Sequence, residues 1–219
     1  MSNYLAIATV TATFRDLIAQ AIQQVPDLSA APTVTTGRPQ APEPGFVGVN
    51  LYLYRVEANA TLRNRSFPIP HTESEGSLVD RWQNALNLDY LLTFYGKGQQ
   101  QEPERLMGGM IAALTDTPIL KPELIRQTIS TTGSDSYLAA SDLANQIETV
   151  RLTPIYLNLE ELSKLWTVFF QVTHNLSIAY QASVVLIDSG EKIFLKTVKK
   201  VEGTVTSTKK STRKTRKTI

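Results

Sequence analysis

Two histidines and one glycine-rich turn are the features of this sequence whose residue types and spacing come closest to supporting chemistry. His71 has Glu73 and Glu75 nearby, but a metal ion would need more ligands than this neighbourhood offers. His174 stands between a predicted helix and a predicted strand, where a turn or capping role is the better interpretation. Gly96-Lys97-Gly98 follows a predicted strand, yet it lacks the glycine spacing of phosphate-binding loops, and the sequence contains no G-x-S-x-G nucleophile elbow. The sequence therefore predicts no enzyme, no metal ion and no cofactor.

The strongest physical signal is a cluster of cations near the end of the sequence. The 219 residues include 22 Lys+Arg and 20 Asp+Glu, for a net charge of +2. Residues 1–195 have a net charge of −6 and residues 196–219 have +8. We call residues 206–219 the basic tail; its cations are Lys209, Lys210, Arg213, Lys214, Arg216 and Lys217. Such a segment can bind nucleic acid or an anionic membrane, solubilise the chain, or dock on an acidic protein surface. It has no aromatic residue to stack on bases.

Composition restricts the class of protein further. An apolar content of 42% suits a globular chain, and roughly 200 residues can bury a sizeable core. The lack of Cys excludes a disulfide scaffold, thiolate metal sites and a Cys nucleophile. The sequence has no apolar run near the ~20 residues that cross a bilayer, and no secretory signal is visible. We therefore expect assembly in the cytoplasm.

Hydrophobic periodicity predicts helices and strands around one sheet. Residues 4–25 have apolar side chains spaced by three or four, as one face of a helix does, and Pro26 ends the pattern. Further helices are expected from Pro103, at 123–127 and after Asn158. Strands are expected at 46–56, 86–95, 147–157, 176–187 and 193–205. Loops or arms are expected at 26–45, 57–85 and 128–142. This order predicts an α+β fold with a single mixed sheet flanked by helices, long polar arms and a basic tail. Residues 1–190 would form the domain, and 191–219 would add one strand and the tail.

Side-chain patterns within these elements predict how they pack. Strand 46–56 is apolar on both faces, which indicates cover on both sides. Pro154 interrupts strand 147–157, so we expect that strand at a sheet edge. Asn158 with Glu161 is a variant of the capping box. The inward face of the helix that follows would comprise Leu159, Leu162, Leu165, Trp166 and Phe169. One face of strand 176–187 would comprise Leu176, Ile178, Tyr180, Ala182, Val184 and Leu186.

Several blocks, taken in order and spacing, resemble one known family. They include Val49-Asn50-Leu51-Tyr52-Leu53-Tyr54, Leu88-Asp89-Tyr90-Leu91 and Leu159-Glu160-Glu161-Leu162, and the matching stretches together span about residues 4–188. With these blocks the chain resembles the tube-terminator, or cap, proteins of phage-tail-like contractile injection systems. The basic tail lies outside the resemblance.

The resemblance implies a structural protein. It implies a homohexameric ring that terminates the inner tube and holds the last sheath layer at the end distal to the baseplate, with the tube and sheath proteins of the same particle as partners. The arms at 57–85 and 128–142 and the sheet edges are the expected interface. Arg63 and Arg65 are its candidate residues, together with the tail cations Lys209, Lys210, Arg213, Lys214, Arg216 and Lys217.

Two readings of the basic tail remain as alternatives. The resemblance favours contact with a protein surface of the same particle, so nucleic acid is not the expected partner. A membrane contact of the tail stays open, and an adaptor that binds nucleic acid or a membrane through the tail is the alternative function. The sequence does not fix whether the particle stays cytoplasmic, attaches to a membrane or is released.

Overall fold

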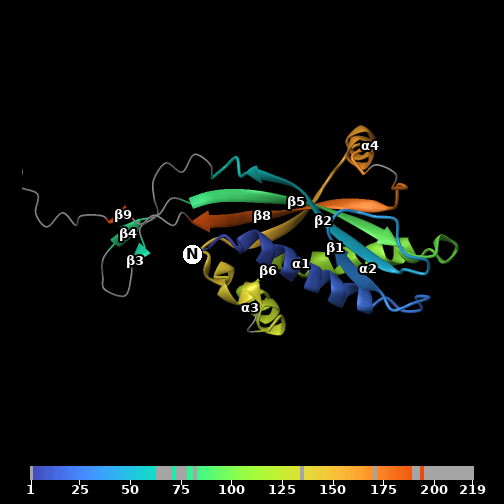
Figure 1. Ribbon diagram of the computed structural model, residues 1–219, viewed down its shortest axis with the longest axis horizontal. Coiled ribbons are helices and arrows are strands. Elements are labelled where there is room, and N and C mark those ends of the chain that lie inside the picture. The colour runs from blue at the N-terminus through green and yellow to red at the C-terminus, as the bar shows by residue number, and fades with distance from the viewer. Residues whose placement is uncertain are drawn as a thin grey trace, which may run out of the picture.

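The computed structural model describes residues 2–62, 71–72, 78–80, 83–133, 136–169, 172–188 and 193–194 (Figure 1). Its α-helices are α1 (Ala6–Gln23), α2 (Glu102–Asp116), α3 (Pro122–Thr131) and α4 (Leu159–Thr167). Its strands are β1 (Thr33–Thr36), β2 (Gly48–Ala58), β3 (His71–Thr72), β4 (Leu78–Asp80), β5 (Gln83–Tyr95), β6 (Ile119–Leu120), β7 (Val150–Ile155), β8 (Ser177–Asp188) and β9 (Ile193–Phe194). Short 3-10 turns occupy Gly98–Gln100, Tyr137–Ala140 and Leu143–Asn145.

Six strands form the main sheet, in the order β1-β2-β5-β8-β7-β6. β1 runs parallel to β2, and the other neighbouring pairs are antiparallel, so the sheet is mixed and the predicted α+β class is confirmed. The two longest strands, β5 and β8, lie in the middle. Strands β3, β4 and β9 form a separate small sheet beyond the end of the main sheet where β5 begins and β8 ends (Figure 1). Of the strand expected at 193–205, only 193–194 lies within the described residues.

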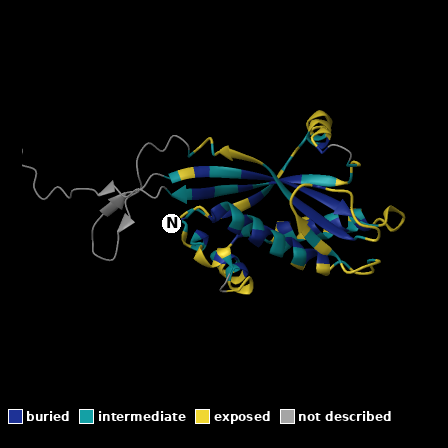
Figure 2. Cartoon of the chain, in the orientation of Figure 1, coloured by how far each residue is buried: buried dark blue, intermediate teal, exposed yellow. Residues whose placement is uncertain are grey.

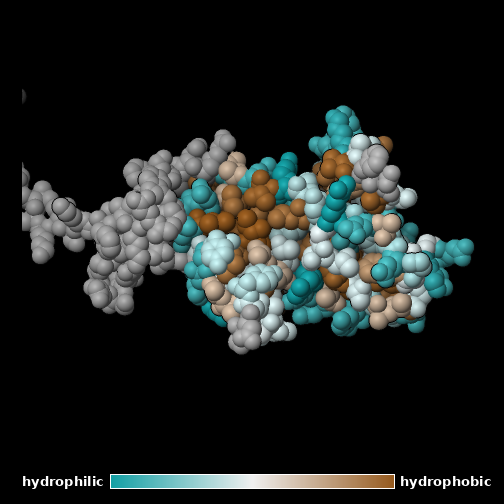
Figure 3. Space-filling model, in the orientation of Figure 1, coloured by the Kyte–Doolittle hydropathy of each residue, from teal (hydrophilic) through white to brown (hydrophobic). Residues whose placement is uncertain are grey.

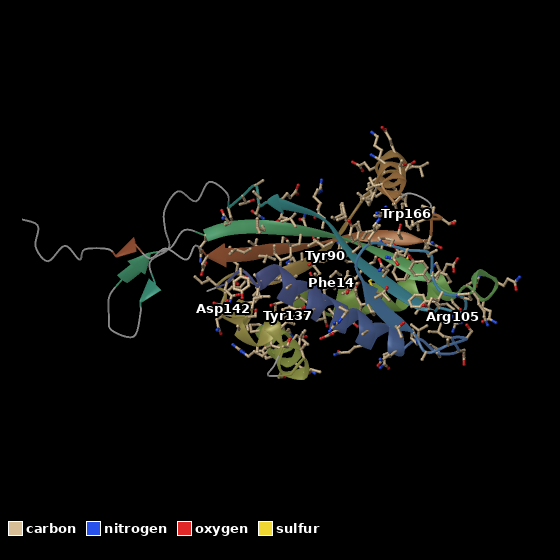
Figure 4. All side chains as sticks on the ribbon, in the orientation of Figure 1. Phe14, Tyr90, Arg105, Tyr137, Asp142 and Trp166 are labelled. Carbon is tan, nitrogen blue, oxygen red and sulfur yellow. The ribbon has the colours of Figure 1, made fainter. Side chains whose placement is uncertain are left out.

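The main core lies between one face of the sheet and helices α1 and α2 (Figure 2). In α1, Val10, Phe14 and Ile18 recur every fourth residue and are fully buried, which confirms the helix predicted from the sequence. The Phe14 ring meets the Tyr90 ring of β5 edge to face, with centroids 5.5 Å apart (Figure 4). The Tyr90 hydroxyl shares a hydrogen bond of 2.8 Å with Thr11 Oγ1, so its one polar atom is satisfied inside the core.

Helix α4 covers one end of the opposite face of the sheet. Trp166 and Phe169 pack there against Leu91, with Tyr52 and Tyr54 partly buried beside them, so strand β2 is covered on both faces over this part of its length. The predicted capping box is present: Asn158 Oδ1 accepts from Glu161 N at 2.9 Å, and Glu161 Oε2 accepts from Asn158 N at 3.0 Å.

The predicted inward face of α4 is wrong at Leu159. Its side chain is 84% exposed, whereas Trp166, on the same helix stripe, is 7% exposed. The reason is geometric: α4 is in contact with the sheet through its C-terminal turn, and its first turn stands away from the strands (Figure 1). Periodicity predicts which residues share the apolar face of α4, but it does not predict how many of them are buried against the sheet.

A β-bulge in β8 corrects the predicted face of that strand. Leu88 pairs with Ala182, but Leu86, two residues earlier, pairs with Val185, three residues later. The extra residue reverses which side chains face the core. Val185 is therefore fully buried in the main core, so the predicted alternation holds as far as Ala182 and is wrong at Val184 and Leu186.

Strand β1 lies within a segment predicted to be a loop. The strand has only four residues and is flanked by Pro32 and Pro39, so its sequence pattern resembles that of a loop. Gly48 permits the pairing, because a Cβ at this position would lie 2.0 Å from the Thr33 carbonyl oxygen. After β1, residues 37–46 cross the end of the sheet; we call this segment the strap.

Two further boundaries differ from prediction. Helix α3 extends to Thr131, so the first residues of the expected 128–142 loop are helical. Strand β7 is only partly an edge, because β6 pairs with Val150 and Arg151. Pro154 lies past the end of β6. Among the described residues, the edge of β7 has no partner strand there, so the missing N–H of proline costs no hydrogen bond on that side.

Candidate interaction surfaces

The described residues contain no group of three or more His, Cys, Asp or Glu side chains placed to hold a metal ion. Within the same ranges, no helix is long and apolar enough to span a membrane. His71 contributes backbone to β3. His174 lies at 5.0 Å, centroid to centroid, from the Trp166 ring, next to the end of α4. The turn or capping role of His174 stays a prediction.

The predicted interface cations are not placed by the structure. Arg63 and Arg65 lie outside the described residues, as do the tail cations Lys209, Lys210, Arg213, Lys214, Arg216 and Lys217. Their roles in an interface therefore stay predictions. The surfaces below are built from other residues.

A network of polar side chains crosses three strands on the face opposite α1. The Asp89 carboxylate of β5 is fully buried; Oδ2 accepts from Arg55 Nε at 2.6 Å and Oδ1 accepts from Gln181 Nε2 at 2.9 Å. Arg55 lies at a bulge in β2, and its side chain is 52% exposed. Burial and the nearby Asp89 carboxylate raise the pKa of Tyr54. The buried carboxylate thus holds, through Nε, the guanidinium of a half-exposed side chain. The sequence signal, which we missed, is a single Asp inside the apolar run 86–95.

A second surface surrounds the junction of α4 and β7. A cleft of about 350 Å³ opens there between Ile155, Leu157 and Leu162 on one side and the start of β8 on the other. Tyr156 and Leu159 stand beside it with 89% and 84% of their side chains exposed. Figure 3 shows hydrophobic residues gathered next to α4. Together they form the α4–β7 surface, an apolar concavity of the kind that protein partners fill.

A third surface lies on the helix-facing side of the sheet, beside the N-terminal half of α1. Val56 is 45% exposed there, and Ile7, Leu53 and Leu86 are partly buried against the core. Figure 3 shows hydrophobic residues gathered above the first half of α1, at the opposite end of the main sheet from α4. We call these four residues the apolar strip. β1 pairs with β2 only as far as Leu51, so among the described residues the edge of β2 beside the strip is unpaired.

The loops at the far end of the sheet are held by one buried carboxylate. Glu102, at the start of α2, accepts hydrogen bonds from Lys97 N and Ser29 N, both at 2.6 Å. The bond from the Lys97 backbone, with those from Ser29, lowers the pKa of Glu102. Gly96 makes this approach possible, since a Cβ there would lie 2.7 Å from the Glu102 Cβ. The Gly96-Lys97-Gly98 turn therefore binds a carboxylate of its own chain. Gly109 has a similar packing reason, because Val25 of the α1 end lies against it.

Comparison with known proteins places these features in a family. The model of the Pvc16 N-terminal domain family matches residues 9–194. A solved sheath/tube terminator from an extracellular contractile injection system (PVC, extended state) has a TM-score of 0.59 and 15% identity, covering 92% of this chain and 64% of that one. The solved tube-terminating cap of the anti-feeding prophage (AFP) has a TM-score of 0.53 and 16% identity, covering 87% and 59%. No curated protein sequence matched.

Each comparison shows something different. The two solved structures, at 15% and 16% identity, show a shared fold, and the chain spans 64% and 59% of their lengths. The family model matches most of the chain, from within α1 to β9. The protein belongs to the Pvc16 N-terminal domain family.

Proposed function

We propose that this protein is a structural cap of a contractile injection system. It forms a ring that terminates the inner tube and holds the last sheath layer at the end distal to the baseplate. The observation that supports this function best is the family match over residues 9–194, joined to a fold shared with two tube-terminating proteins. The protein acts by shape and contact, without catalysis, and the particle is assembled in the cytoplasm.

The proposed assembly is a homohexamer. A closed ring uses a heterologous interface, in which one surface of each subunit contacts a different surface of the next. The α4–β7 surface and the apolar strip are two unlike apolar surfaces at opposite ends of the main sheet (Figure 1). We assign them to the two sides of this interface. The tube and sheath proteins are the proposed partners along the particle axis.

Electron microscopy of particles made without this protein tests the function. Because a cap stops tube growth, we expect tubes of irregular length with open ends and a sheath that detaches or contracts early. Restoring the protein should restore sealed tubes of uniform length. Sealed tubes of normal length in its absence would refute the cap role.

The alternative adaptor function makes a different prediction. If the basic tail bound nucleic acid, binding would weaken steeply with salt and disappear on deletion of residues 206–219. Gel-shift titration of DNA at two salt concentrations measures this directly. We expect only weak binding that does not depend on sequence, and normal capping in the presence of nuclease.

A further inference from the structure

A polar cleft lies between the strap and the end of the main sheet. It has a volume of about 520 Å³. Its floor is formed by Thr35 of β1, Asn50 of β2 and Tyr95 of β5, and its roof by strap residues that include Gln40, Glu43 and Phe46. The strap is held by the Phe46 and Tyr95 rings, which meet edge to face at 5.6 Å, and by a long hydrogen bond of 3.4 Å from the Tyr95 hydroxyl to the Gln40 carbonyl.

The floor of this cleft has an unused hydrogen-bond acceptor. Asn50 is 5% exposed, and its Nδ2 donates to Thr35 Oγ1 at 3.1 Å. Its Oδ1 is buried and has no hydrogen-bond partner among the described residues. Leaving a buried polar atom unpaired is unfavourable, because the atom loses its hydrogen bonds to water and gains no partner. The floor therefore favours a ligand that donates hydrogen bonds.

The rest of the lining narrows the chemistry of that ligand. The Glu43 carboxylate is exposed at the rim, and the Phe46 and Tyr95 rings form an aromatic wall. Arg38 also lines the cleft, but its Nη2 donates to the Val168 carbonyl at 2.9 Å and its guanidinium lies 5.9 Å from the Phe169 ring, so it is directed toward α4. Acceptors, a carboxylate and aromatic faces together suit a guanidinium, which is planar, cationic and only a donor.

We propose that this cleft binds an arginine side chain, Arg213 or Arg216, from the basic tail of the same or a neighbouring copy. The tail is rich in donors and has a charge opposite to that of residues 1–195. Arg213 is the nineteenth residue after Phe194, and an extended chain of that length reaches about 63 Å. The 12 residues of β8 span about 40 Å, which leaves about 23 Å of that reach for the distance between β9 and the end of β8. This binding does not depend on the cap function.

Disulfide trapping in the full chain tests the proposal, because the protein has no native Cys. One double variant combines Thr215→Cys with Ala41→Cys on the strap. The control combines Thr215→Cys with Gln20→Cys, at an exposed position of α1. We expect rapid cross-linking to the strap position and at least tenfold slower cross-linking to α1. Gel mobility separates a bond within one chain from a bond between two copies. Equal rates at the two positions would overturn the proposal.

Substitutions then separate a specific guanidinium site from general attraction. Glu43→Gln on the exposed strap should slow trapping about tenfold without affecting the fold, and Asn50→Leu should slow it further. Arg213→Lys with Arg216→Lys keeps the charge but removes the planar donor, so trapping should also slow about tenfold. If these lysines cross-link as fast as the native arginines, the tail is held by charge alone and no arginine site exists.

Discussion

At the scale of single residues, the Asp89 network is the most unusual feature of the sheet. A buried carboxylate in a central strand is unfavourable unless it is paired, and Arg55 is its basic partner among the described residues. Arg55→Met should therefore destabilise the protein by about 2 kcal/mol, because the charge of Asp89 stays buried. Adding Asp89→Leu to this variant should recover part of the loss. Urea unfolding of the single and double variants measures the coupling.

A matched control for this pair is the neighbouring Glu57. Its carboxylate is 3.8 Å from Arg55 Nε, and both side chains are largely exposed. Glu57→Gln should change the unfolding free energy by no more than about 0.5 kcal/mol. A loss as large as that from Arg55→Met would mean that the stability comes from general surface charge and that the buried carboxylate is unimportant.

Glu102 predicts a pH dependence of stability. Its folded-state pKa is lowered, mainly by the hydrogen bond from the Lys97 backbone. Its stabilising contribution is therefore fully present above the ordinary Glu pKa of about 4.3 and is lost as pH falls through the lower folded value. Glu102→Gln should be less stable than wild type at pH 7, and the difference should shrink below about pH 4. Urea midpoints at pH 7 and pH 3 measure this.

The control for Glu102 is Glu104, which is two residues further along α2 and exposed. Glu104→Gln should have urea midpoints close to those of wild type at both pH values. An unchanged gap between Glu102→Gln and wild type at pH 3 would show that the side chain stabilises by shape, with its charge irrelevant.

At the scale of elements, α4 depends on its N-terminal cap because so little of the helix contacts the sheet. Trp166 is its one buried helical residue, and Phe169 follows just after its end. Removing the Asn158 side chain by Asn158→Ala should cost about 1 kcal/mol, localised to α4. Hydrogen exchange should rise in α4 while β5 and β8 stay protected. Ser163→Ala, on the exposed side, is the control; equal protection in both variants would contradict the capping role.

The elements that the sequence predicted well have long, regular patterns. α1 buries every fourth residue, and the capping box of α4 depends on two residues three apart, so both follow from local rules. β1 escaped prediction because its four residues lie between prolines and owe their structure to β2. The bulge near Ala182 was not predicted either. A bulge depends on the pairing of two strands, and the alternation of residues within one strand does not reveal its position.

The candidate surfaces were harder to predict than the fold for a related reason. The sequence pointed to cations in the arms and the tail, where composition is conspicuous. Two of the described surfaces instead contain exposed apolar residues, such as Leu159 in the first turn of α4 and Val56 in β2. Whether such a residue is buried depends on where α1 and α4 end relative to the sheet. That relation is set by tertiary packing, which a single sequence does not reveal.

At the scale of the whole molecule, a heterologous ring makes a prediction that a two-fold interface does not. Tyr156→Asp with Leu159→Asp alters the α4–β7 surface, and Val56→Asp alters the apolar strip. The substituted side chains are all exposed, so we expect both variants to fold, and each should fail to form a ring because one side of every contact has a buried charge. Ile111→Asp, on the exposed side of α2, is the control and should assemble normally. Mass photometry measures the assemblies.

Mixing the two variants is the decisive measurement. In a heterologous interface the intact α4–β7 surface of one variant can contact the intact strip of the other, but the chain of contacts stops there. The mixture should therefore form dimers and no hexamers, while each variant alone stays monomeric. If the strip were instead paired with itself across a two-fold axis, the double variant at Tyr156 and Leu159 would still dimerise alone. Full hexamers from either variant would exclude these surfaces from the ring.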